Sequence, residues 1–173
     1  MTEIHIRPAD PGDRPFLLAM LVEAADWSGR VSLTAAGVED DPALAHYIDG
    51  WPRPSDFGVI ATNGAGDLMG AAWARQFDVD DPGYGFVDND VPEIGMGVVT
   101  AFRGHGVGTR LLAALISEAR DRSCRALSLS VEDGNRAARA LYERAGFVRH
   151  GRNGNSDTMT LDITGTVGQE LSR

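Results

Sequence analysis

The sequence has a single cysteine, Cys124, so it cannot form an intrachain disulfide and shows no sign of a disulfide-rich secreted scaffold. The N-terminus lacks the apolar segment of a signal peptide. No hydrophobic run approaches the ~20 residues that cross a bilayer. We therefore expect a cytoplasmic protein that has no membrane partner.

Basic residues are scarce, since Lys and Arg together number 16 against 25 Asp and Glu, which gives a net charge of −9. Such a balance repels a phosphate backbone, so we expect no nucleic-acid partner. The histidines have no Cys or His neighbours at ligand spacing, and the sequence therefore predicts no metal site. They stand at His5, His46, His105 and His150.

The 173 residues are 43% hydrophobic, which is enough to fill one sizeable core. We expect a single domain over residues 1–165 and a frayed tail over 166–173. Hydrophobic periodicity predicts an alternation of strands and helices. The expected strands cover 4–8, 57–62, 68–75, 93–99, 126–131, 147–150 and 158–163, and the expected helices cover 16–24, 43–48, 107–122 and 136–145.

Two stretches are expected to be loops. Residues 76–92 are acidic and rich in Pro and Gly, and both a substrate-side role and a merely solvated excursion fit that composition. Residues 151–157 are expected to form the loop between the last two strands.

A glycine-rich segment lies between an expected strand and an expected helix, where backbone N–H groups and the helix dipole can hold a pyrophosphate. Glycine allows close approach of the phosphates and the positive φ of such a loop. A tight turn without a ligand is the alternative for these residues taken alone. The segment reads Arg103, Gly104, His105, Gly106, Val107, Gly108.

Two rival phosphate loops fit less well. A dinucleotide fingerprint that starts at Gly104 has Thr109 where its third glycine should stand, although Glu132 occupies a position typical of a ribose-binding acid. A nucleoside-triphosphate loop needs a lysine, and none follows here.

The second informative segment is the helix expected over 136–145. Asn135 is a natural N-cap, and Gly146 is a natural C-terminal stop. Helical spacing places Asn135, Ala138 and Tyr142 along one side, where they would line one groove. Taken alone, the segment is better explained as an ordinary capped amphipathic helix with Leu141 and Tyr142 partly buried.

Together the two segments resemble the GNAT family of N-acetyltransferases, which pair an Arg/Gln-x-x-Gly-x-Gly/Ala loop with a downstream Asn and a Leu-Tyr-x-x-x-Gly-Phe helix end. Thr100 departs from the proline that many members carry before the loop. The matching residues are Arg103, Gly106, Gly108, Asn135, Leu141, Tyr142, Gly146 and Phe147.

The resemblance implies an α/β fold with a mixed, mostly antiparallel sheet of six to seven strands, about four flanking helices and one splayed strand pair. It implies acetyl-CoA as the acyl donor, with pantetheine bonded to the main chain of Val98 and Val99 and the pyrophosphate on the N–H groups of 103–108. Asn135 would bind the pantetheine arm, and the Tyr142 hydroxyl would protonate the leaving thiolate.

The family often uses a carboxylate on the strand before the loop as a base, commonly through a water, and Glu93 is the candidate here. A glutamate at a strand end is equally compatible with a surface position, and Asp157 is a weaker alternative. Aromatic candidates for the acceptor pocket, which core packing explains equally well, are Trp27, Trp51, Tyr84 and Phe86.

We therefore expect an N-acetyltransferase that moves an acetyl group to a primary amine of a small molecule or peptide by direct attack. The alternative is a non-catalytic acyl-CoA-binding or regulatory module on the same fold. The sequence leaves the acceptor, the acyl chain length and the oligomeric state open, although homodimers are frequent in the family.

Overall fold

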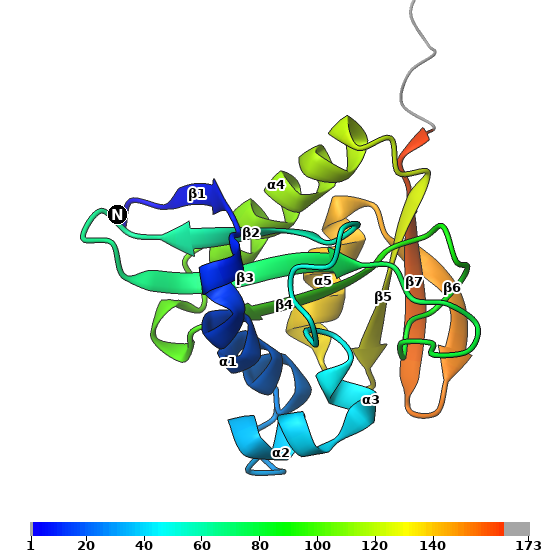
Figure 1. Ribbon diagram of the computed structural model, residues 1–173. Helices are drawn as coiled ribbons and strands as arrows, with labels where there is room; N and C mark the ends of the chain where they lie inside the picture. The colour runs from blue at the N-terminus through cyan, green and yellow to red at the C-terminus, as the bar shows by residue number, and fades with distance from the viewer. Residues whose placement is uncertain (1, 165–173) are drawn as a thin grey trace, which may run out of the picture.

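A seven-stranded open sheet forms the centre of the protein, whose computed structural model describes residues 2–164 (Figure 1). The tail expected over 166–173 lies outside the described residues. The strand order is β1-β2-β3-β4-β5-β7-β6, and every neighbouring pair is antiparallel except the parallel pair β4 and β5. This confirms the predicted fold class. The strands are β1 His5–Pro8, β2 Phe57–Thr62, β3 Leu68–Arg75, β4 Glu93–Val98, β5 Ala126–Glu132, β6 Val148–Asn153 and β7 Ser156–Asp162.

Helices cover both faces of the sheet, and each face has its own hydrophobic cluster. One cluster joins α4 and α5 to the sheet, and the other joins α1 and the 35–51 region to the opposite face. In Figure 1, α1 crosses in front of the sheet. The helices are α1 Arg14–Ala25, α2 Ala35–Asp40, α3 Pro42–Ala45, α4 Val107–Asp121 and α5 Arg136–Ala145, with short 3₁₀ turns at Pro11–Asp13 and Thr100–Phe102.

The strands β4 and β5 separate soon after they meet. Their register pair is Glu93 with Ser128, and the Ser128 N–H donates to the Pro92 carbonyl at 2.9 Å. On its other side, β5 pairs with β7 along its whole length, from Ala126 to Glu132. The edge of β4 that faces β5 is therefore open beyond Glu93, as the splayed pair requires.

A buried ion pair lies at the C-terminal end of β3, where Arg75 pairs with Asp56. The Arg75 guanidinium donates to both carboxylate oxygens of Asp56, at 3.0 and 2.6 Å, and the two side chains are 1% and 0% exposed. The same guanidinium donates to the carbonyls of His46 and Asp49, each at 2.8 Å. Arg75 therefore fixes the chain that follows α3.

Two elements differ from the sequence predictions. The loop expected at 151–157 is shorter, because β6 and β7 extend through it to a turn at Gly154 and Asn155. β6 is an exposed edge strand made mostly of polar residues, so it lacks the hydrophobic alternation that would have revealed its length. The helix α2 was missed because it is short and buries only Val38.

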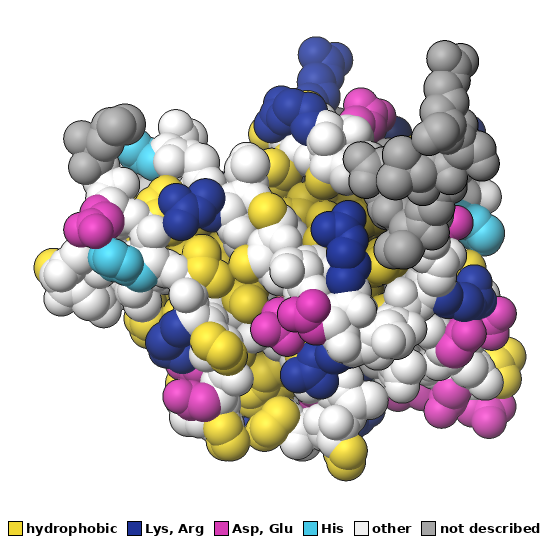
Figure 2. All heavy atoms as spheres, turned by 90° about the horizontal axis from the view of Figure 1, so that it is seen from above, with side chains coloured by type: hydrophobic (Ala, Val, Ile, Leu, Met, Phe, Trp, Pro, Cys, Tyr) yellow, Lys and Arg dark blue, Asp and Glu magenta, His cyan; other side chains and the backbone are white. Residues whose placement is uncertain are grey.

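The surface seen in Figure 2 mixes arginine, acidic and hydrophobic side chains and does not gather the arginines into one basic patch. No helix within residues 2–164 is long and apolar enough to cross a membrane. Across those same residues, no group of three His, Cys, Asp or Glu side chains is placed to hold a metal ion.

Candidate functional site

One large groove, of about 1210 Å³, opens where β4 and β5 separate. Its walls come from α1, β4, the start of α4, the end of β5, α5 and the turn between β6 and β7. The predicted site residues that line it are Glu93, Val98, Arg103, Gly104, Gly106, Val107, Gly108, Asn135 and Tyr142. Segments far apart in the sequence therefore meet in one cavity.

The glycine-rich loop ends at the N-terminus of α4. Gly104 and Gly106 have φ of +76° and +84°, and the position of an added Cβ is open space at both, so their glycine identity is set by backbone conformation. The first α4 hydrogen bond is donated by the Arg110 N–H to the Gly106 carbonyl. The N–H groups of Val107, Gly108 and Thr109 precede it and can face an anion.

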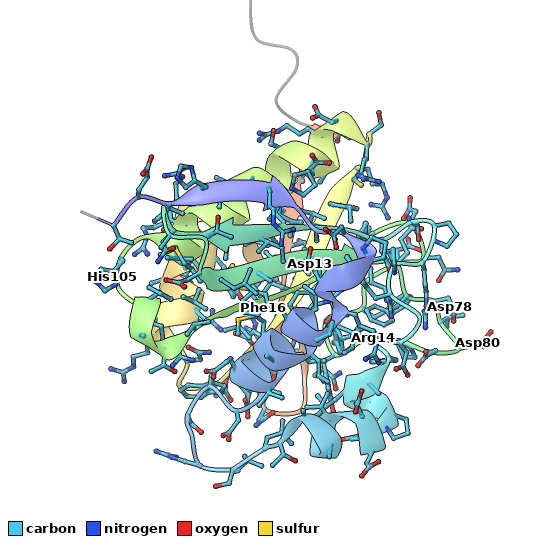
Figure 3. The ribbon with its side chains drawn as sticks, turned by 60° about the vertical axis from the view of Figure 1, so that its left-hand side comes forward. Asp13, Arg14, Phe16, Asp78, Asp80 and His105 are labelled. Atoms are coloured by element: carbon cyan, nitrogen blue, oxygen red, sulfur yellow. The ribbon has the colours of Figure 1, made fainter. Side chains whose placement is uncertain are left out.

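Gly108 has a different reason to be glycine, because an added Cβ would lie 3.3 Å from the Leu141 side chain of α5. It lets α4 and α5 pack closely. His105 is exposed at the outer edge of the loop, as labelled in Figure 3, so only its main chain is suited to the predicted role.

The Arg103 side chain spans the mouth of the groove. Its guanidinium donates to Glu23 of α1 at 2.6 Å and to the Val98 carbonyl at 3.2 Å. An anion bound to the loop would therefore compete with Glu23 for the Arg103 charge.

The main chain of β4 offers alternate residues to the open edge. The Val99 N–H donates to the Met69 carbonyl of β3, and the Val99 carbonyl accepts from the Phe102 N–H, both at 2.8 Å. Val99 therefore does not fit the predicted pantetheine contact. Because adjacent residues of a strand point their N–H and C=O groups to opposite sides, Met96 and Val98 face the splay instead.

The helix α5 has the predicted bounds and presents two of the predicted residues to the groove. The Asn135 side-chain oxygen accepts from the Ala138 N–H at 3.3 Å, which leaves its amide NH₂ for a ligand. Tyr142 is buried, and burial raises the pKa of its hydroxyl to about 12. The phenol therefore keeps its proton at neutral pH.

Glu93 is 2% exposed and lies at the start of β4, at the point where β5 diverges. Burial raises its pKa to about 7, against the lowering effect of hydrogen bonds from the Tyr47 hydroxyl and the Gly85 N–H. Those two donors lie 2.6 and 2.9 Å from Oε1. Oε2 is buried without a hydrogen-bond partner in the described structure. A carboxyl group with these properties can exchange a proton near neutral pH.

The 76–92 loop covers this carboxyl group. An alanine at Gly83 would bring its Cβ within 1.9 Å of Glu93 Oε2, and one at Gly85 would meet the Leu129 main chain at 2.5 Å. The glycines thus let the loop close over Glu93. In Figure 3, the labelled Asp78 and Asp80 point outward from the same loop, away from His105.

Two weaker predictions do not fit the structure. Asp157 is held in ion pairs with Arg139, Arg149 and Arg152, and the hydrogen bond from Arg139 holds its pKa below the usual range, so it is not a suitable base. Trp51 is buried in the core and donates to the Asp10 carbonyl. Of the other aromatic candidates, Trp27 and Tyr84 line the groove, and Phe86 lines a separate small pocket.

Sequence reasoning missed Tyr47 and gave Glu132 a different role. Tyr47 comes just after α3, and no pattern in the sequence links it to Glu93. Glu132 accepts from Trp27 Nε1 at 2.7 Å and from the Asn155 amide at 3.0 Å. The position of Glu132 at the end of a strand was the only sequence feature that singled it out, and that feature suggested a contact with a ribose.

Comparisons with known proteins identify the same two segments within one family profile. The Acetyltransferase (GNAT) family profile matches residues 21–147. A mycothiol acetyltransferase of Paenarthrobacter aurescens is 33% identical over 122 residues, which are 68% of this chain and 33% of that protein. The chain thus spans about a third of the length of this relative.

Two further matches extend over most of both chains. An L-methionine sulfoximine/L-methionine sulfone acetyltransferase of Pseudomonas paraeruginosa is 29% identical over 150 residues, or 85% of this chain and 81% of that protein. The structure of yncA from Salmonella typhimurium with its cofactor acetyl-CoA has a TM-score of 0.68 at 20% identity and covers 98% of this chain and 99% of that one. This second likeness supports the fold.

Proposed function

Because the chain belongs to the acetyltransferase (GNAT) family, as the resemblance predicted, we propose that it transfers an acetyl group from acetyl-CoA to a primary amine by direct attack. One observation carries the proposal: the splay of β4 and β5, the anion-ready loop, Glu93 and Tyr142 all open onto one groove. The acceptor belongs to a small molecule or a peptide.

The residues present fit acetyl-CoA. The donor supplies a thioester carbonyl for the amine to attack. The N–H groups of 103–108 would hold its pyrophosphate, and Arg103 would exchange its Glu23 partner for a phosphate oxygen. The pantetheine arm would be held by the Asn135 amide and by the main chain of Met96 and Val98. Val99 has no part in this contact.

A base is needed because an ordinary amine with a pKa of about 10.4 is only about one part in a few thousand neutral at pH 7. Glu93, with a pKa of about 7, is matched to that task. Since its carboxylate is covered, the proton has to reach it through a relay. Tyr47 lines the groove and its hydroxyl lies 2.6 Å from Oε1, so we assign this hydroxyl the role of passing the proton on.

The Tyr142 hydroxyl assists departure of the thiolate. Full transfer of its proton to a thiol of ordinary pKa, about 8.5, would be uphill by roughly 4 to 5 kcal/mol. We therefore assign it the donation of a hydrogen bond to the sulfur as charge develops there, with the proton following to the released thiolate from solvent.

Replacing Tyr142 with Phe should lower kcat by about 10- to 100-fold, at or below the low end of general acid effects, because Tyr142 donates only a hydrogen bond and the thiolate is a good leaving group without help. The dissociation constant for CoA should change little, since the ring remains. Steady-state kinetics and calorimetric titration with CoA would measure the two quantities. An unchanged kcat would remove Tyr142 from this role.

Replacing Tyr47 with Phe should raise the pKa of Glu93 above 7, because the lost hydrogen bond stabilises the carboxylate form. The rise of kcat/KM with pH should then shift to higher pH, and kcat should fall because the relay is broken. A pH series of kcat/KM tests this. If kcat/KM of the variant rises over the same pH range as that of the wild type, Tyr47 does not influence the pKa of the base.

The function itself is tested by thermal midpoints with acetyl-CoA, CoA, NAD and ATP in parallel, followed by thiol release with an amine panel. A ligand at about 100 times its dissociation constant should stabilise the protein by roughly 2.7 kcal/mol. Stabilisation by acetyl-CoA with thiol release supports the enzyme. Stabilisation without release from any amine favours the non-catalytic module, and a response to NAD alone contradicts both.

A further inference from the structure

The charges that line the groove are divided between its two sides. The sequence contains no lysine. The arginines that line the groove lie on the loop before α4 and on α5, the two elements that would hold the cofactor, and they are Arg103, Arg136 and Arg144. The acceptor side, formed by the end of α1, the 41–47 region, the end of β5 and the β6–β7 turn, carries Asp41, Glu93 and Glu132. Its described lining includes no basic side chain.

Glu132 is a fixed carboxylate whose charge has no cationic partner among residues 2–164. Trp27 Nε1 donates to one oxygen at 2.7 Å, and the Asn155 amide donates to the other at 3.0 Å. Both donors are neutral, so they orient the carboxylate but leave its charge in place. The Trp27 ring lies beside it and packs near Gly134, and an aromatic wall next to an anion is suited to an ammonium group.

Glu93 and Glu132 lie on the same face of the sheet. Glu93 is paired with Ser128, and Glu132 is four residues further along β5, so its side chain points the same way, about 13 Å along the strand. Glu93 is buried with one carboxylate oxygen unpartnered, and it lines the same groove. An acceptor that lies along this wall has the exposed edge of Glu132 at one end and the buried Glu93, reached through Tyr47, at the other.

We propose that the acceptor is an amine that carries a second cationic group and no carboxylate, and that Glu132 binds the second cation while the first amine reacts. This rests on the proposed acetyl transfer. An α-amino acid fits poorly, because its carboxylate would lie among Glu93, Glu132 and Asp41 without an arginine. The relative that acetylates L-methionine sulfoximine acts on an α-amino acid, whose carboxylate would need a cationic partner that this side of the groove lacks among the described residues.

The kinetic test compares diamines from 1,3-diaminopropane to 1,8-diaminooctane with monoamines of equal length and with L-methionine sulfone. In the wild type, kcat/KM for the best diamine should exceed that for its monoamine at least tenfold. In Glu132→Gln this ratio should fall about tenfold, or ~1.4 kcal/mol. Glu118→Gln, on α4 beside Arg122, makes the same charge change outside the groove and should keep the ratio.

Preference for L-methionine sulfone, or an equal ratio in Glu132→Gln and wild type, would overturn the inference. A second measurement avoids turnover: calorimetric titration of the best diamine into the CoA complex, where Glu132→Gln should weaken binding about tenfold with unchanged CoA affinity. Diamine binding that depends on Glu132 without thiol release would support this ligand class and contradict the transfer. Acetylation of L-methionine sulfone without diamine binding would support the transfer and overturn the ligand class.

Discussion

Replacing Glu93 with Gln should lower kcat/KM by about 10²- to 10⁴-fold, the range of general base catalysis, and should abolish the rise of activity with pH that we expect for the wild type near 7. Glutamine keeps the shape and can still accept the hydrogen bonds of Tyr47 and Gly85. It cannot take a proton. The loss should therefore fall on the chemical step, while CoA affinity is retained.

The pH dependence of stability provides a control on the same variant. The pKa of Glu93 is raised by burial from an ordinary 4.5 to about 7, so between these values the folded protein holds a proton that the unfolded chain has lost. The wild type should therefore lose stability as pH rises through this window, by about 3 kcal/mol. Glu93→Gln should lack this loss in urea unfolding at pH 5 and pH 8.

If Glu93→Gln retains the wild-type pH profile of kcat/KM, Glu93 is not the base. If the stability difference is absent while the profile changes, the carboxyl group is more hydrated than its burial indicates. The two measurements thus separate catalytic function from burial.

The sequence was most informative where local chemistry determines the backbone. Asn135 and Gly146 cap the two ends of α5, and glycines turn the chain into α4, so the bounds of α5 and the glycine turn before α4 followed from short motifs. The hairpin of β2 and β3 was predicted for the same reason, because its turn residues and hydrophobic runs are local.

The acceptor side was not predictable in that way, because its contacts join distant segments. Tyr47 and Glu93 are 46 positions apart, and Trp27 and Glu132 are 105 apart. No rule of sequence spacing predicts that the two residues of either pair are in contact. Whether Val98 or Val99 faces the open edge of β4 depends on which N–H group bonds to β3. Only the pairing of β4 with β3 decides this, and it assigns the Val99 N–H to β3.

Replacing Asp56 with Asn should destabilise the protein by about 3 to 5 kcal/mol, because it leaves the buried Arg75 guanidinium without its counter-charge. That is a large share of the roughly 5 to 15 kcal/mol that holds a typical domain folded. Urea unfolding would measure it. The double variant Asp56→Leu with Arg75→Met removes both charges and should recover much of the loss, whereas equal losses in both variants would contradict an electrostatic cause.

The same variant should also change the active site. Arg75 is the cross-strand neighbour of Glu93, yet its donors are taken by Asp56 and by the carbonyls of His46 and Asp49. In Asp56→Asn the guanidinium charge is uncompensated on the same face of the sheet, so it should lower the pKa of Glu93. The rise of kcat/KM with pH should move below 7, opposite to the shift in Tyr47→Phe. A profile that stays in place while stability falls would show that Arg75 supports the fold without acting on the base.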